Sequence, residues 1–274
     1  FSFSAPLPVP YCDSLIETGV RNLKRLKRIA GCSIGIENLA TQFSLEDVFA
    51  PGEILARILR EIEGFLVLDL HNLYCQSLNF EIPLLDLVKT YPLNCALEIH
   101  ISGGSFSRSK GGNSKKAIRR DTHDGAVPEP LFNILSEVLD ATPSVRAVIL
   151  ERLGNTFENP FDRQLFREEF LRMREIIKAV NFARVSSPSP AFDYGIELKR
   201  DYHDFSLDRT VLARYQSILL DLLSSGLNPL EVVEALRSNQ ELRILTPYFD
   251  SLELPMLEVG QDLMWKWAVS NSFQ

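Results

Sequence analysis

Long apolar runs are missing from this sequence of 274 residues. No stretch approaches the roughly 18 consecutive apolar residues that a membrane-spanning helix needs. Residues 1–6 also lack the basic start and the apolar centre of a signal peptide. An excess of positive charge is missing too, because the net charge is -7, which argues against nucleic-acid binding by the whole surface.

Cysteine is scarce, and its four positions have neither a C-x-x-C pair nor zinc-finger spacing. The four residues are Cys12, Cys32, Cys75 and Cys95. The last three lie in or beside apolar runs, so we expect buried, reduced thiols. A reducing cytoplasm is the simplest compartment for such a chain.

Motifs of nucleophilic catalysis and of phosphate binding are also missing. The sequence has no G-x-S-x-G elbow, and no cysteine with a histidine partner that the sequence implies. No G-x-G-x-x-G or Walker pattern follows a predicted strand. The sequence therefore gives little support to a serine or cysteine nucleophile or to phosphate cradling.

Four short apolar runs each end on a residue type that can bind a metal. They cover residues 33–38, 65–72, 96–100 and 147–151. Continuous apolar runs of this length are typical of strands that are buried on both faces, as in parallel sheets. Because the carboxyl ends of parallel strands meet on one side, we expect the polar residues at these ends to converge there.

Helix-like segments alternate with these strands in units of about 30 residues, which indicates βαβ units. Residues 13–30, 51–63, 83–90, the segment after Pro130 and the segment after Pro160 have helical patterns and matching start or stop residues. Four clear strands fit either an open α/β sheet or the second half of a (β/α) barrel whose first strands are missing from this chain.

A change of pattern divides the chain. Residues 186–190, Ser-Ser-Pro-Ser-Pro, predict a linker or a long loop. The segments 208–225, 229–236 and 255–269 that follow are all helical in pattern. We therefore expect a barrel portion over residues 1–185, with the metal site, and a helical extension over residues 186–274.

The two best-placed histidines have acidic neighbours that suit metal binding. His100 ends a predicted strand, and His123 lies between Asp121 and Asp124. An imidazole and a carboxylate two residues apart can reach one cation from an extended segment. Together with carboxylates and an amide at the other strand ends, they predict an iron, manganese or zinc site. The candidate ligands are Glu37, Asp69, His71, Asn72, His100, Asp121, His123 and Glu151.

Two alternatives to metal ligation remain at individual positions. Some of the acids could only cap the helices that follow, and Glu98 and Asp124 fit that role best. Asp69 could instead fix a turn at its strand end, and His71 could support a ligand without touching the metal. Several carboxylates at one sheet end would otherwise lose their water at a cost of several kcal/mol per ion, and a cation removes that cost.

A basic segment leaves the same predicted sheet end. It runs from Gly103 to Arg120 and contains no acid. It could be a mobile lid or a clamp on an acidic substrate, with Arg108, Lys110, Lys115 and Lys116 as the binding residues, or simply a solvated loop. Its Gly103-Gly104 pair would let a backbone come close to a ligand.

The ordered motifs resemble the multinuclear non-haem iron-dependent oxidative enzymes, a family that includes the methanobactin biosynthesis enzyme and relatives that modify cysteines of ribosomally made peptides. The resemblance covers roughly residues 6–160. The matching stretches are residues 6–11 (PLPVPY), 36–38 (IEN), 68–72 (LDLHN), 99–103 (IHISG), 121–124 (DTHD), 128–130 (PEP) and 150–152 (LER).

This resemblance implies a TIM-barrel-like (β/α)8 fold that binds two or three iron ions and uses dioxygen. It implies oxidation of a cysteine in a precursor peptide, which a partner protein or domain delivers. By motif, Glu37, Asn72, His100, Asp121, His123 and Glu151 correspond to iron ligands or close supports, and Asp69 is a further candidate.

The sequence departs from the family pattern in three places. Earlier strands with further histidine ligands would precede Pro6, and they are not in this sequence. His71 stands where many members have asparagine, and Leu153 follows Arg152 where many have aspartate. Two alternatives to the oxidative function therefore stand beside it: a redox-neutral metal-dependent isomerase or phosphodiesterase on a similar barrel, and a binding or scaffold protein without catalysis.

Overall fold

The computed structural model describes residues 8–108, 116–180 and 207–270 of the chain. Its helices and strands follow one another as α1 (Asp13–Ala30), β1 (Gly35–Glu37), α2 (Leu45–Phe49), α3 (Pro51–Ile62), β2 (Phe65–Asp69), α4 (Leu70–Phe80), α5 (Leu84–Val88), η1 (Leu93–Cys95), β3 (Ala96–Ser102), β4 (Phe106–Ser107), β5 (Ile118–Arg119), α6 (Glu129–Ala141), β6 (Ala147–Glu151), η2 (Gly154–Phe157), α7 (Pro160–Ala179), α8 (Arg209–Ser224), α9 (Pro229–Ser238), η3 (Gln240–Leu245), α10 (Thr246–Ser251) and α11 (Leu254–Ser270).

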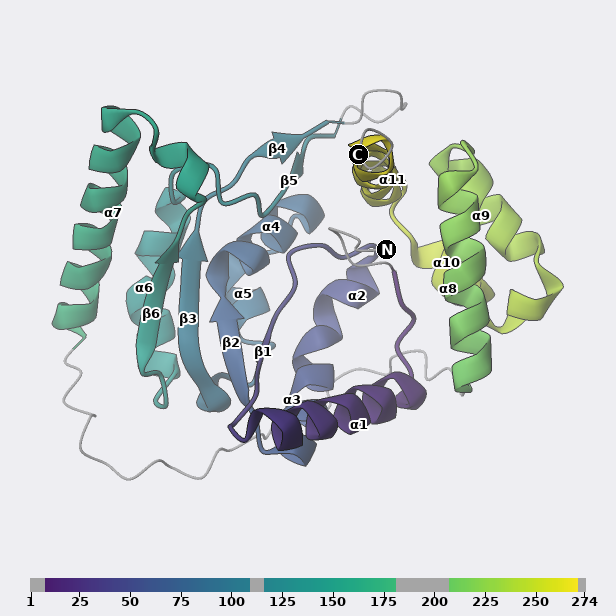
Figure 1. Ribbon diagram of the computed structural model, residues 1–274, viewed down its shortest axis with the longest axis horizontal. Helices are drawn as coiled ribbons and strands as arrows, with labels where there is room; N and C mark the ends of the chain where they lie inside the picture. The colour runs from purple at the N-terminus through teal and green to yellow at the C-terminus, as the bar shows by residue number, and fades with distance from the viewer. Residues whose placement is uncertain (1–7, 109–115, 181–206, 271–274) are drawn as a thin grey trace.

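The four predicted strands form one parallel sheet in the order β1-β2-β3-β6 (Figure 1). The described part of the chain is thus an α/β fold, as the apolar runs predicted. Asp69 on β2 pairs with His100 on β3, and Ser102 on β3 pairs with Glu151 on β6. Residues that pair across a parallel ladder lie on the same face, so this register brings the polar strand ends together.

One face of the sheet is buried beneath helices. Leu66, Leu68, Ile99 and Ile101 have no exposed surface and belong to a hydrophobic core that also takes in residues of α3, α4 and α6. Figure 1 shows α4, α5 and α6 behind the strands. The alternate positions of the strands point to the other face, which carries His100.

Local sequence explains where the predicted helices begin and end. Gly31 ends α1 with a φ of 66°, a left-handed conformation that costs glycine little. Pro51 starts α3 at a position where the missing N–H is not needed. Asn228 and Glu231 form a capping box at the start of α9.

The structure corrects one part of the predicted strand at residues 65–72. The strand ends at Asp69, and Leu70, His71 and Asn72 are the first turn of α4. The Asp69 side chain caps this helix by accepting a hydrogen bond of 2.6 Å from the backbone N–H of Asn72. A strand therefore passes into a helix without a loop, directly beneath the candidate ligands.

Helices α8 to α11 share a second hydrophobic core, which includes Cys12, Phe43 and Ile118 from earlier in the chain (Figure 1). The hydroxyl of Tyr215 donates to the carbonyl of Pro8 at 3.0 Å. The predicted linker at residues 186–190 lies outside the described residues. No helix within the described ranges is both long and apolar enough to cross a membrane.

The cysteine prediction is confirmed for Cys75 and Cys95, which are buried, and it is wrong for Cys32, which is exposed. Cys32 lies just after the glycine that ends α1, before β1 begins. The apolar run beside it starts too late to cover its side chain.

Candidate metal centre

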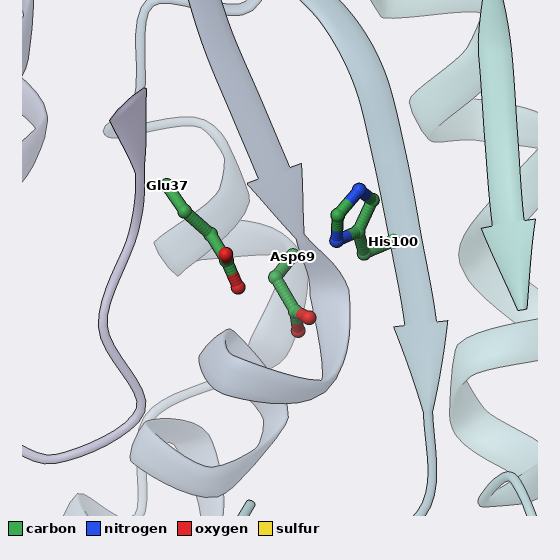
Figure 2. A group of neighbouring side chains, drawn as sticks. All are labelled: Glu37, Asp69 and His100. Atoms are coloured by element: carbon green, nitrogen blue, oxygen red, sulfur yellow. The ribbon is translucent and has the colours of Figure 1, made fainter. Parts of the chain in front are cut away.

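Three side chains at the ends of neighbouring strands face one common space. Figure 2 shows Glu37 of β1, Asp69 of β2 and His100 of β3 directed towards one another. Each offers one ligand atom, and these atoms all lie within 4.8 Å of one another. Carboxylate oxygens and an imidazole nitrogen at such spacing form a donor set that suits divalent iron, manganese or zinc.

Asn72 extends this group from the first turn of α4. Its amide nitrogen donates to Glu37 Oε1 at 3.2 Å and to the carbonyl of Asn38 at 2.8 Å. Both amide protons are used, so the amide oxygen is the atom that remains. That oxygen is buried and has no hydrogen-bond partner.

Two more buried atoms in the same space lack a partner, namely Asp69 Oδ2 and His100 Nδ1. The latter lies 3.2 Å from Glu151 Oε1, but without the geometry of a hydrogen bond. Buried acceptor oxygens without a donor are costly and rare in folded proteins. A bound cation would satisfy Asp69 and Asn72 at once, so the residues present fit a metal ion.

A second group of predicted ligands adjoins the first through Glu151. His123 Nδ1 lies 3.5 Å from Glu151 Oε2, while Glu151 Oε1 faces His100. His123 Nε2 lies 2.8 Å from Asp121 Oδ2. All of the predicted ligands therefore lie in one connected cluster at the carboxyl end of the sheet.

The position of His123 depends on an unusual backbone conformation. Its φ is 53°, in the left-handed region that few residues other than glycine adopt. The carbonyl of His123 accepts a hydrogen bond from the N–H of Leu153 at 2.9 Å, which holds this conformation. A strained residue at a cluster of chemical groups is typical of functional sites.

Crowding of the acids shapes their protonation. Burial raises the pKa of Asp69 well above its usual value, and the nearby carboxylates Asp121 and Glu37 raise it further. Loss of water also raises the pKa of Glu37, against the attraction of His100. A cation among these carboxylates would favour their charged forms.

Asp121 is the exception among the acids. Burial acts to raise its pKa, but hydrogen bonds from His123 and His71 outweigh burial and hold it well below its usual range. The same bond to Asp121 raises the pKa of His123 to about 9. For His71, burial dominates and lowers the pKa.

The sequence suggested Glu98 and Asp124 as helix caps, and neither residue caps a helix. Glu98 lies within β3, with Oε2 3.5 Å from His100 Nε2. Asp124 accepts a hydrogen bond of 2.6 Å from the hydroxyl of Thr122, and α6 begins after Pro128 instead. Asp69, by contrast, caps α4 with one oxygen, and its other oxygen is buried without a hydrogen-bond partner.

The Gly103-Gly104 pair serves the protein's own backbone. A Cβ atom on Gly103 would lie 2.1 Å from the carbonyl oxygen of Ala126, and one on Gly104 would lie 2.2 Å from that of Arg120. The chain that carries Asp121 and His123 thus passes directly over these glycines. The sequence led us to expect that a ligand would come close to these glycines, but residues 120–126 of the chain itself do so.

The structure describes two of the four residues predicted to form a basic clamp. Arg108 and Lys116 are exposed at the two ends of the segment, beside the antiparallel pair of β4 and β5. Lys110 and Lys115 lie outside the described residues.

Sequence reasoning missed several supporting residues. Asn38 is buried, and its side chain makes two hydrogen bonds to the backbone of Asp69, at 2.8 and 2.9 Å. Ser102 donates to Asp121 Oδ1 at 3.2 Å. Arg119 donates to His71 Nε2 at 3.2 Å. The position of Asn38 directly after a predicted ligand was the one local clue.

Comparison with known proteins bears on this cluster. The model of the family described as "RiPP precursor modification enzyme MbnB/TglH/ChrH" matches residues 2–177, where RiPP denotes a ribosomally made, modified peptide. The chain belongs to this family. The match covers every candidate ligand and ends near the end of α7.

The curated relatives of this chain share about a quarter of its residues in the matched region. A UPF0276 protein of Shewanella loihica is 23% identical over 162 residues, which cover 59% of this chain and 54% of the relative. A UPF0276 protein of Chromobacterium violaceum is 26% identical over 134 residues, which cover 48% of this chain and 46% of the relative. The chain thus spans about half the length of the curated relatives that it matches.

Proposed function

We propose that the cluster binds two or three iron ions and uses dioxygen to oxidise a cysteine in a ribosomally made precursor peptide. The observation that carries this proposal is the set of buried acceptor oxygens without donors, Asp69 Oδ2 and Asn72 Oδ1, beside two imidazoles and three further carboxylates. Membership of a family of precursor modification enzymes supports the peptide substrate.

The proposed ligands fall into two adjoining groups. Glu37, Asp69, Asn72 and His100 form the first, and Asp121, His123 and Glu151 form the second, with Glu151 facing an imidazole of each. Iron held by histidine and carboxylate ligands with open positions supplies the binding and activation of dioxygen. The protein's own residues would hold the ions through these carboxylate, amide and imidazole groups.

The exposed basic residues give the proposed substrate a docking surface. Arg108 and Lys116 lie beside the strand pair β4–β5, which leads into Asp121. Positive charge without any acid from Gly103 to Arg120 would attract an acidic leader peptide. Delivery of the peptide by a partner protein or domain is part of the same proposal.

The proposed architecture follows from the family. The four parallel strands would form part of a (β/α)8 barrel within residues 1–185, and residues 186–274 would form a helical extension. The parallel order β1-β2-β3-β6, with ligands at the carboxyl ends, supports this arrangement because barrel enzymes place their chemistry there.

Iron loading under anaerobic conditions tests the metal site. We expect more than one equivalent of iron per chain by elemental analysis, and at least a tenfold weaker retention in Asp121→Asn. Asp124→Asn is the matched control, because this exposed aspartate bonds only the nearby Thr122 hydroxyl in the described structure. Less than one equivalent of iron in the wild-type protein would contradict the proposal.

Dioxygen uptake tests the chemistry. The iron-loaded protein should consume dioxygen when it is mixed with a cysteine-containing precursor peptide, and should not do so when that cysteine is replaced by serine. Equal turnover with and without dioxygen would favour a redox-neutral isomerase or phosphodiesterase. Iron binding without any turnover would favour a binding or scaffold protein.

A further inference from the structure

We propose that His71 is a positioning residue that orients Asp121 through a fixed imidazole tautomer and does not bind the metal itself. The inference rests on the proposed metal site, because Asp121 is one of its ligands. His71 is fully buried in the first turn of α4, between Asp121 on one side and Arg119 on the other.

The partners of His71 determine which ring nitrogen carries the proton. Arg119 Nη2 lies 3.2 Å from His71 Nε2. A guanidinium has only donors, so Nε2 must be the acceptor and cannot carry a proton. The proton of the neutral ring therefore lies on Nδ1, which is 2.8 Å from Asp121 Oδ1 and donates to it.

This bond assigns different roles to the two oxygens of Asp121. Oδ1 accepts from His71 and also from the Ser102 hydroxyl at 3.2 Å. Oδ2 faces His123 instead, at 2.8 Å from its Nε2. His71 and Ser102 therefore occupy one oxygen and direct the other into the cluster, where a cation would bind it.

Both ring nitrogens of His71 are already used within the protein. Nε2 accepts from Arg119 and lies 3.9 Å from the buried thiol of Cys75, which can donate to the same lone pair. A metal at Nε2 would have to displace a cation, and a metal at Nδ1 would break the bond to Asp121. A supporting role fits these contacts, and direct ligation does not.

Arg119 is itself held in place, which makes the arrangement rigid. Its backbone N–H donates to Asn79 Oδ1 at 2.8 Å, and its carbonyl accepts from Asn79 Nδ2 at 3.0 Å. Its guanidinium lies over the rings of Phe106 and Tyr74, at 5.1 and 5.7 Å from their centroids. Residues 71, 75 and 79 are four apart, so one side of α4 carries the contacts to β5.

Two amide substitutions test the roles of the two ring nitrogens of His71 one at a time. The amide of His71→Asn reaches the place of Nδ1 and can donate to Asp121, whereas that of His71→Gln reaches the place of Nε2 and cannot. We expect the anaerobic Fe²⁺ affinity of His71→Asn to stay within about threefold of the wild type. His71→Gln and His71→Leu should weaken it by about 10- to 100-fold. Equal affinities in all three variants, or an equal loss in all three, would overturn the inference.

Nitrogen NMR of the histidine-labelled wild-type protein gives a second measurement, which reads the position of the ring proton directly and not through an affinity. The His71 signal, assigned by its absence in His71→Asn, should show a proton on Nδ1 both without metal and after addition of Zn²⁺. A proton on Nε2, or coordination of either nitrogen by Zn²⁺, would overturn the inference. Wild-type protein that binds no iron would contradict the proposed function alone, since the proton on His71 is measured without metal.

Discussion

At the scale of single residues, close backbone contacts limit what the site can tolerate. Gly104 lies between the loop that carries Asp121 and the ring of His71. A Cβ atom there would meet the Arg120 carbonyl oxygen at 2.2 Å and His71 Cε1 at 2.8 Å. A backbone atom cannot move aside as a flexible side chain can, so even one methyl group must displace the loop.

Gly104→Ala should therefore lower the free energy of unfolding by about 1–3 kcal/mol, the usual cost of overpacking. It should also weaken the proposed iron binding, because the displaced loop carries Asp121. Gly154→Ala is the matched control, since a Cβ atom there meets nothing within 4 Å, and should be close to neutral. Urea unfolding of the metal-free proteins measures the difference, and equal stability of the two variants would contradict the packing argument.

At the scale of elements, α4 is the support for the site. It begins at the cap of Asp69, presents His71 and Asn72 in its first turn, and holds β5 through Asn79 in its last. The Asn79 amide satisfies both backbone groups of Arg119, much as a neighbouring strand would. A side chain thus helps to hold the short strand β5, in addition to the pairing of β5 with β4.

Asn79→Ala leaves the N–H and the carbonyl of Arg119 without these partners. An unsatisfied buried polar group costs about 1–3 kcal/mol, so we expect a loss of stability in this range and faster amide exchange in β5. Asn155→Ala, at an exposed position in η2, should change stability by less than about 0.5 kcal/mol. Unchanged exchange in β5 would show that other contacts hold the strand.

The four strands of the parallel sheet were predictable from sequence, whereas the short strands β4 and β5 and the helix α4 were not. Each of these four strands is a continuous apolar run, which the sequence shows directly, although no residue of β6 is fully buried. Helix α4 instead buries polar residues: His71 and Asn72 face the site, Asn79 bonds β5, and Gln76 donates to the Leu39 carbonyl. The apolar periodicity that normally identifies a helix is therefore interrupted.

The same reasoning explains the outcome for the site residues. The candidate ligands stand at strand ends or in a short acidic motif, so local sequence shows them. Asn38, Ser102, Asn79 and Arg119 act on partners 19 to 48 residues away. No spacing in the sequence indicates such contacts, because they arise only when segments far apart in the chain pack together.

At the scale of the whole molecule, the C-terminal helices pack against the first part of the chain through partly polar contacts. The Tyr248 hydroxyl of α10 donates to Asp47 Oδ2 of α2 at 3.3 Å. The N–H of Glu253 donates to the carbonyl of Phe43 at 2.7 Å. Burial raises the pKa of Asp47 to about 7, despite the hydrogen bonds from Ser44 and Tyr248.

This shift makes the stability of the protein depend on pH. The pKa of Asp47 in the folded state lies above the ordinary value of about 3.9 in an unfolded chain. The group therefore favours folding fully below about pH 4, and this contribution is lost as the pH rises through about 7.

Asp47→Asn should remove the loss of folding stability that ionisation of Asp47 causes as the pH rises. We expect its free energy of unfolding, relative to the wild type, to increase by at least about 1 kcal/mol between pH 4 and pH 7.5. Asp140→Asn, at an exposed position on α6, should follow the wild-type curve. Denaturant unfolding across this pH range measures the three proteins, and parallel curves for Asp47→Asn and the wild type would contradict the prediction.

The strand order has a mechanical consequence. β1 and β6 are the outermost members of the ladder and share no hydrogen bond with each other. Glu37 and Glu151 nevertheless bring both of them to the cluster. Ions coordinated there would tether the two margins of the sheet across its end, so removal of iron by a chelator would free those margins first. The metal content of a preparation would then set how readily proteases cut it beside β1 and β6.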